Sequence, residues 1–155
     1  MDINFSAEDL AFRDEVREFF DQEYDSAIKA KLSSKVGEEY KQGMVDWQKK
    51  LYAKGWVAPG WPAEYGGTEW TSTQKFIYET ERGLAGIPDV VPFGLKMVAP
   101  VIYTFGNEEQ KKRFLEPTFE SKDWWWQGYS EPGAGSDLAE LNTTADYAGD
   151  NYIVN

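Results

Sequence analysis

Apolar residues recur at intervals of three and four along the first 120 residues, which is the spacing of one helical face. The clearest stripes are Phe12, Val16, Phe19 and Phe20, and then Tyr40, Met44, Trp47 and Leu51. Ser6 and Asn107 each precede a helical pattern and are followed three positions later by a capping-box partner. Gly55 is placed to end the second striped helix. Shorter helices are expected after Asp25, through Ile28 and Leu32 to an end near Gly37, and over 72–83. The pattern predicts an N-terminal helical bundle.

Residues 90–105 are apolar almost all round, interrupted only by Lys96 and Thr104. A helix of this composition is buried on most sides, and Pro100 should kink it. The segment 55–67 is rich in glycine, proline and tryptophan. Because so much aromatic surface is not left in water, we expect an ordered loop, which either closes the end of the bundle or lines a pocket.

The pattern changes after residue 122. Residues 124–130 are aromatic and uncharged, which suits a buried strand, and two further strands are expected over 141–147 and 152–155. Three strands cannot form a core alone, so the sheet should be exposed on one face or completed by another chain. The predicted fold is mainly α, with an N-terminal helical bundle over 1–122 followed over 123–155 by the first strands of a small antiparallel β-domain.

Charge and composition narrow the possible partners. The chain has 27 acidic and 16 basic residues, and its net charge of −11 disfavours binding to nucleic acid or to anionic membranes. It has no cysteine and no histidine, so disulfides, a histidine base and histidine metal ligands are excluded, and no metal site is expected. No apolar run is long enough to insert in a membrane, and residues 1–5 do not resemble a signal peptide. The chain is therefore expected to be soluble and cytoplasmic.

A polar loop follows the aromatic segment. Pro132 cannot continue a strand, while Gly133 and Gly135 permit positive φ and close approach of a ligand to the backbone. Ser136 and Asp137 add polar side chains, so the loop could hold a phosphate-bearing molecule. The alternative is a plain connection whose glycines only turn the chain. It is not a dinucleotide fingerprint, because no amphipathic helix follows.

Residues 127–138 have the sequence QGYSEPGAGSDL, which resembles the signature segment of the acyl-CoA dehydrogenase family of flavoproteins. Three further stretches resemble segments of that family in the expected order, namely 60–67, 100–115 and 149–155. The resemblance covers essentially the whole chain but only the first part of the family's usual length. The C-terminal helical domain of the family is absent from the sequence.

The resemblance implies α,β-dehydrogenation of an acyl-CoA thioester in fatty acid or lipid metabolism. A carboxylate would take the α-proton while FAD accepts the β-hydride. It also implies an electron-transfer flavoprotein as electron acceptor and a homo-oligomer, either a tetramer or a dimer. The family's base is a glutamate in the C-terminal helical region, so the catalytic residue is unknown here. Glu131 is not expected to be that base, and the chain alone is expected to be inactive.

The cofactor-binding residues implied by the resemblance are Gln127, Gly128, Tyr129, Ser130, Gly135 and Ser136. The first four would lie along the flavin ring and the last two at the pyrophosphate, and Ser136 would also touch the pantetheine arm of the substrate. Structural alternatives are that Ser130 caps a turn, Gln127 faces a neighbouring strand and Ser136 forms an ST-turn. Four residues of the apolar helix would border the acyl chain, namely Phe93, Leu95, Met97 and Val98.

Three functions remain open on these grounds. The chain could be the N-terminal part of an FAD-dependent acyl-CoA dehydrogenase. It could belong to a relative that uses the same scaffold with oxygen, such as an acyl-CoA oxidase or a flavin monooxygenase. It could also be a non-catalytic, truncated subunit that pairs with a fuller subunit in a heteromer.

Overall fold

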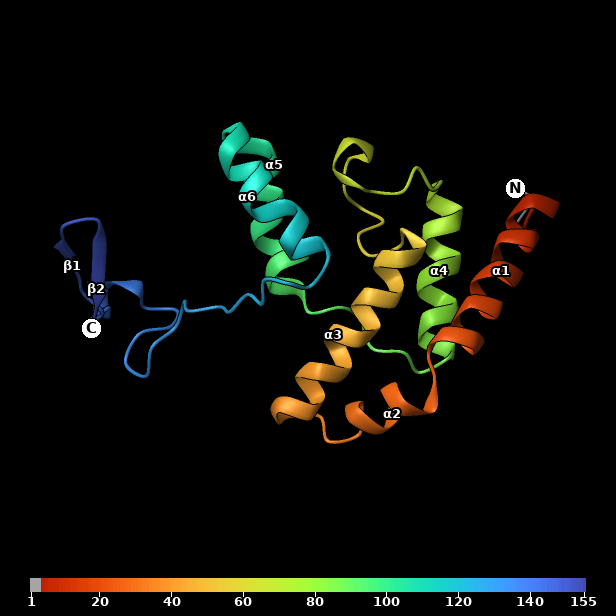
Figure 1. Ribbon diagram of the computed structural model, residues 1–155, viewed down its shortest axis with the longest axis horizontal. Coiled ribbons are helices and arrows are strands. Elements are labelled where there is room, and N and C mark those ends of the chain that lie inside the picture. Colours follow the sequence, from red (N-terminus) through yellow and green to blue (C-terminus); the bar gives the residue numbers. More distant parts are fainter. Residues whose placement is uncertain (1–3) are drawn as a thin grey trace. The chain divides into compact units, whose positions relative to one another are not determined.

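The computed structural model describes residues 4–155 (Figure 1). In this range the elements are α1 (Ala7–Glu23), α2 (Ser26–Leu32), α3 (Gly37–Lys54), η1 (Ala63–Tyr65), α4 (Ser72–Leu84), η2 (Phe93–Val98), α5 (Ala99–Phe105), α6 (Glu108–Phe119), η3 (Leu138–Glu140), β1 (Ala145–Ala148) and β2 (Asn151–Val154). They form two compact units, the first ending at Trp125 and the second running from Trp126 to Asn155. None of the helices in residues 4–155 is long and apolar enough to cross a membrane.

The predicted caps and stripes of the first helices are confirmed. The Ser6 hydroxyl accepts from the amide of Asp9 at 3.1 Å, while the Ser6 amide donates to the Asp9 carboxylate at 3.2 Å, which completes the capping box of α1. The predicted stripe of α1 contributes Phe12, Val16 and Phe20 to the core. Helix α1 packs against α4, and α2 packs against α3.

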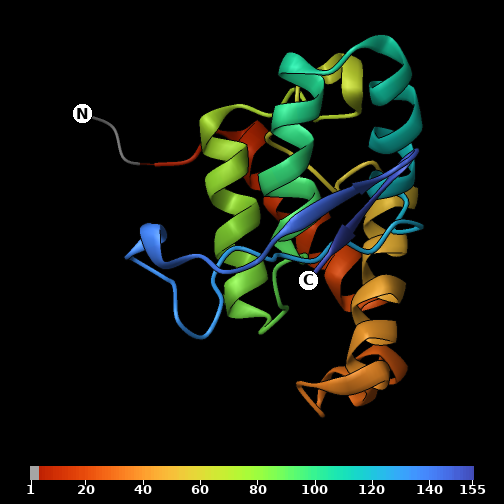
Figure 2. The same ribbon diagram turned by 90° about the vertical axis from the view of Figure 1, so that its left-hand side faces the viewer.

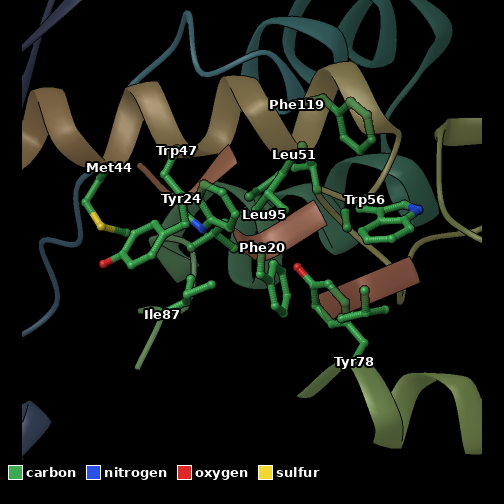
Figure 3. Close-up of a cluster of buried hydrophobic side chains, with 14 of the residues drawn as sticks. Phe20, Tyr24, Met44, Trp47, Leu51, Trp56, Tyr78, Ile87, Leu95 and Phe119 are labelled. Atoms are coloured by element: carbon green, nitrogen blue, oxygen red, sulfur yellow. The ribbon is translucent and has the colours of Figure 1, made fainter. Parts of the chain in front are cut away.

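Helix α3 ends where the sequence predicted. Gly55 has a φ of +77°, the left-handed conformation in which glycine lacks the steric penalty of other residues. Met44, Trp47 and Leu51 of this helix are buried, and Trp47 is fully inaccessible. Its ring lies 6.1 Å from that of Phe20 between centroids, so α3 and α1 share one aromatic core (Figure 3).

The segment 55–67 is ordered, as predicted. Trp56 and Trp61 are both buried, and the Trp61 indole N–H donates to the backbone carbonyl of Leu95 at 2.8 Å. A Cβ at Gly67 would lie only 1.7 Å from the Trp61 carbonyl oxygen, so the loop can close only around a glycine. These contacts attach the loop to η2.

The apolar stretch 90–105 differs from its prediction. It forms the π-helical segment η2 and then α5, one continuous column in Figure 2. The amide of Ala99 donates to the carbonyl five residues earlier, and this wider turn relieves the crowding that the Pro100 ring would cause in a regular helix.

The prediction that the helix over 90–105 is buried on most sides is also wrong. Leu95 is buried, but Met97, Val101 and Phe105 are exposed, Phe105 by 81%. These three are spaced four apart, so they form one apolar stripe on the side of the column that faces away from the core. In the described chain, α6 packs against α5, and the Trp61 indole of the 55–67 loop donates to the Leu95 carbonyl of η2.

The expected strand at 124–130 is likewise wrong. Trp125 is anchored to the helical unit, because its indole N–H donates to the Thr118 hydroxyl at 2.7 Å. Trp124 packs against the same core, whereas Trp126 is 82% exposed. Strand structure requires a ladder of hydrogen bonds, and the described residues contain no partner strand for this segment. The contacts of the Trp124 and Trp125 side chains with the helical unit therefore determine the path of the backbone at the start of this segment.

The second unit contains one antiparallel hairpin. Ala145 pairs with Val154 and Ala148 with Asn151, and Gly149 has a φ of +70° in the turn between them. Both strands are exposed along their whole length. The mainly α class with a small antiparallel sheet is confirmed, and the described residues contain no strand before Trp124.

Candidate functional site

The polar loop of the second unit is closed by a pair of backbone hydrogen bonds. The amide of Glu131 donates to the carbonyl of Ala134, and the amide of Ala134 donates to the carbonyl of Glu131, each at 3.0 Å. Pro132 and Gly133 form the tip of this turn. Ser130 and Gly135 are the next residues outward on its two arms, so the turn brings together the two halves of the predicted site.

Glu131 has a structural role in this unit. Its carboxylate accepts from the Asn142 amide at 2.9 Å, the Thr143 amide at 3.3 Å and the Thr143 hydroxyl at 3.2 Å. These bonds tie the turn to the residues that lead into β1. A carboxylate held in this way is a poor candidate for a proton acceptor, which agrees with its exclusion as the base.

The sequence did not reveal these two partners. Asn142 and Thr143 have no motif of their own, and they meet Glu131 across 11 and 12 residues of chain.

The backbone before the turn is free to bind. Among the described residues, nothing accepts a hydrogen bond from the amides of residues 126–130. A Cβ added to Gly128, Gly133 or Gly135 would meet no atom within 4 Å. None of the three has a positive φ, so the positive φ considered for Gly133 and Gly135 is not used. Neither backbone conformation nor crowding within the chain requires glycine at these positions, and the open backbone leaves room for a ligand.

The side chains of this segment are also unpaired. The hydroxyls of Ser130 and Ser136 and the amide of Gln127 form no hydrogen bond within residues 4–155. The structural alternatives, a capped turn, an inter-strand contact and an ST-turn, are therefore not formed here. Tyr129 is exposed as well, and the adjoining Asp137 instead caps η3 by accepting from the Ala139 amide at 3.2 Å. Free amides, free hydroxyls and an open backbone suit a ligand with phosphate oxygens and a polar ring edge.

The first unit contains a cavity of about 360 Å³ between α3, α4, the 55–67 loop and η2. Of the four residues expected to border an acyl chain, only Leu95 lines it. Val98 is half-buried outside it, Phe93 likewise, and Met97 is exposed. The acyl-chain role of these four residues stays a prediction. Among the described residues, no cluster of carboxylates could hold a metal ion.

Comparison with known proteins supports the resemblance. The family described as "Acyl-CoA dehydrogenase, N-terminal domain" matches residues 6–122. Acyl-CoA dehydrogenase FadE26 of Mycobacterium tuberculosis is 40% identical over 159 residues, which cover 100% of this chain and 39% of that protein. The chain thus spans about two fifths of the length of this relative.

Solved structures give the same result. The ChsE4-ChsE5 complex from Mycobacterium tuberculosis contains a chain 37% identical to this one, with a TM-score of 0.76, covering 100% of this chain and 39% of that one. A structure described as "Tcur3481-Tcur3483 steroid ACAD" is 32% identical, with a TM-score of 0.75 and coverage of 99% and 39%. With the family match and these relatives together, the chain belongs to the acyl-CoA dehydrogenase family, and residues 6–122 correspond to its N-terminal domain.

Proposed function

We propose that this chain is part of an FAD-dependent acyl-CoA dehydrogenase that oxidises the Cα–Cβ bond of a CoA thioester. The observation that supports it most directly is that the amides of residues 126–130 and the hydroxyls of Ser130 and Ser136 are unpaired in the described chain, beside glycines with open space around them. A site of this kind acts by holding its cofactor and substrate in a fixed relation. The proposal includes the division into a helical domain over 1–122 and a β-domain beginning at 123, and a cytoplasmic location.

In the proposed site, FAD supplies the hydride acceptor when bound. The backbone amides near Tyr129 and the Ser130 hydroxyl donate to the polar edge of the ring, and Gln127 and Gly128 lie beside it. Gly135 offers an open backbone, and the Ser136 hydroxyl donates to pyrophosphate oxygens and to the pantetheine arm. The Glu131–Ala134 hydrogen bonds keep the two groups of donors on adjacent arms of one turn. These residues bind and orient the cofactor and the substrate. The base that takes the α-proton is a carboxylate outside residues 4–155.

The partner in this proposal is a second, different acyl-CoA dehydrogenase subunit. Two of the similar structures are described as pairs of proteins, ChsE4-ChsE5 and Tcur3481-Tcur3483, which favours a heteromer over the homo-oligomer expected from the sequence. The second is described as a steroid enzyme, so we extend the proposal to the CoA ester of a steroid as substrate. An electron-transfer flavoprotein would reoxidise the flavin.

The cofactor roles are tested by Ser130→Ala and Ser136→Ala in the assembled holoenzyme. Loss of the Ser130 donor should cost roughly 1–3 kcal/mol of interaction with the ring edge, seen as weaker FAD retention and a lower reduction potential. Ser136→Ala should weaken FAD or CoA-ester binding with less change in potential. Ser72→Ala, which removes an exposed serine hydroxyl without a hydrogen bond, is the matched control. An unchanged potential and unchanged FAD retention in Ser130→Ala would contradict its role.

A further inference from the structure

Ser130 has no fixed point of its own in the polar turn. Neither its amide nor its hydroxyl forms a hydrogen bond within residues 4–155. Going back along the chain, the next residue held by a hydrogen bond in this part of the chain is Trp125. Going forward, Glu131 follows directly and is held by several bonds. The position of Ser130 is therefore set mainly by Glu131.

The Glu131 carboxylate is fixed by a segment further along the chain. The amides of Asn142 and Thr143 donate to one of its oxygens, Oε1, at 2.9 and 3.3 Å. The other oxygen, Oε2, accepts from the Thr143 hydroxyl at 3.2 Å. A side chain held at one oxygen can pivot about it, whereas a side chain held at both cannot. The Thr143 hydroxyl is thus the group that completes the attachment of Glu131.

The segment that carries Thr143 is itself well supported. The next residue, Thr144, exchanges two backbone hydrogen bonds with Asn155, at 3.0 and 3.1 Å. These bonds extend the β1–β2 hairpin as far as the neighbour of Thr143 (Figure 1). The hairpin is therefore a fixed base, and the Thr143 hydroxyl passes its position on to Glu131.

The other arm of the turn has supports that do not involve Thr143. Gly135 and Ser136 lie between Ala134, which is only 2% exposed, and Asp137, which accepts from the Ala139 amide at 3.2 Å. Ser136 is thus held from both sides, whereas Ser130 depends on Glu131. Loss of the Thr143 hydroxyl should consequently disturb the Ser130 arm more than the Ser136 arm.

We propose that Thr143 is a positioning residue of the proposed flavin site, which acts through Glu131 to fix the direction in which the Ser130 hydroxyl donates. This role rests on the proposed function, in which Ser130 donates to the edge of the ring and Thr143 contacts neither cofactor nor substrate. A hydrogen bond weakens steeply when its donor is misaligned. A less firmly held Glu131 therefore weakens the bond between Ser130 and the flavin.

The test is Thr143→Val in the assembled holoenzyme, which removes the hydroxyl and keeps the β-branched shape. We expect the reduction potential of the bound flavin to fall, by less than in Ser130→Ala, and the dissociation constant of FAD to rise about two- to fivefold. Thr143→Ser, which restores the hydroxyl, should restore both values. Thr144→Val is the matched control, because the Thr144 hydroxyl forms no hydrogen bond within residues 4–155.

A double variant separates positioning from a loss of stability. In a Ser130→Ala background the hydroxyl that Thr143 directs is missing, so Thr143→Val should leave the potential unchanged. An equal fall in both backgrounds would overturn the proposal, because it would show an effect that does not pass through Ser130. An unchanged potential in Thr143→Val beside a lowered one in Ser130→Ala would also overturn it and leave the proposed function standing. An unchanged potential in both single variants would remove the role of Ser130 and this role of Thr143 together.

Discussion

At the scale of single residues, Gly94 determines how the helical unit holds its last tryptophan. A Cβ at this position would lie 2.6 Å from the Trp125 ring and 2.8 Å from the Thr118 methyl group. We therefore expect Gly94→Ala to lower the free energy of unfolding by roughly 1–3 kcal/mol through overpacking, measured by urea denaturation.

Gly83→Ala is the matched control for this substitution. Gly83 also lies in a helix, but its added Cβ would meet nothing within 4 Å, so the change should be neutral or stabilise by up to about 1 kcal/mol. In a Trp125→Ala background, which lacks the ring that the new Cβ would meet, Gly94→Ala should lower the free energy of unfolding by less. Equal effects of the two glycine substitutions would contradict the steric explanation.

Glu131 provides a second test at this scale. In Glu131→Ala, the amides of Asn142 and Thr143 lose their acceptor. Because each bond stabilises by roughly 1 kcal/mol, hydrogen exchange at these two amides should accelerate by about fivefold. Exchange in the β1–β2 pairs should change less, since the hairpin keeps its own ladder. Unchanged exchange at residues 142 and 143 would show that Glu131 does not anchor the turn.

At the scale of elements, a salt bridge joins α2 to α3. Lys31 donates to Asp46 at 2.6 Å, and Gln42 donates to the same carboxylate at 2.7 Å. Burial alone would raise the pKa of Asp46, but these bonds outweigh it and hold the pKa below its ordinary value of 3.8. A lowered pKa in the folded state adds stability above that ordinary value, which is lost as the pH falls through the folded pKa.

We therefore expect wild-type protein to lose more unfolding free energy than Asp46→Asn as the pH falls from about 5 to below 4, because only the wild type has this carboxylate to protonate. Denaturation in urea at several pH values measures the difference. Asp21→Asn is the matched control, since Asp21 is exposed and forms no ion pair within residues 4–155. The prediction fails if Asp46→Asn and the wild type have parallel pH profiles.

At the scale of the whole molecule, the 155-residue chain should not turn over acyl-CoA even with FAD supplied. Dehydrogenation needs a free base and a site from which water is excluded. In the described chain Glu131 is engaged by three donors, and the proposed flavin-binding residues are exposed. Assays with an acyl-CoA and an artificial electron acceptor measure this. Turnover by a preparation whose mass is verified as that of the 155-residue chain would contradict this prediction and would make Glu131 a candidate for the base again.

Local features were predictable because they depend on residues within one helical turn. The Ser6 and Asn107 capping boxes and the left-handed Gly55 are all present, and the stripes of α1 and α3 form the core. The turn of the candidate site was predictable as a segment, since its proline and glycine residues cannot continue a strand. The hydrogen bonds that attach this turn to the rest of the unit were not predictable, because Asn142 and Thr143 meet Glu131 only after the chain has folded back.

The sequence by itself determined the helices, their caps, the mainly α class and the family, since these depend on local spacing and on a continuous motif. Only the tertiary structure decided the conformation and the burial of the apolar and aromatic segments. Trp125 is held by Thr118 and Gly94 instead of joining a strand, and Phe105 is exposed on a helix expected to be buried. The physical reason is that hydrophobic burial and backbone pairing both need a partner from elsewhere in the chain, and the composition of a segment does not say which partner will be there.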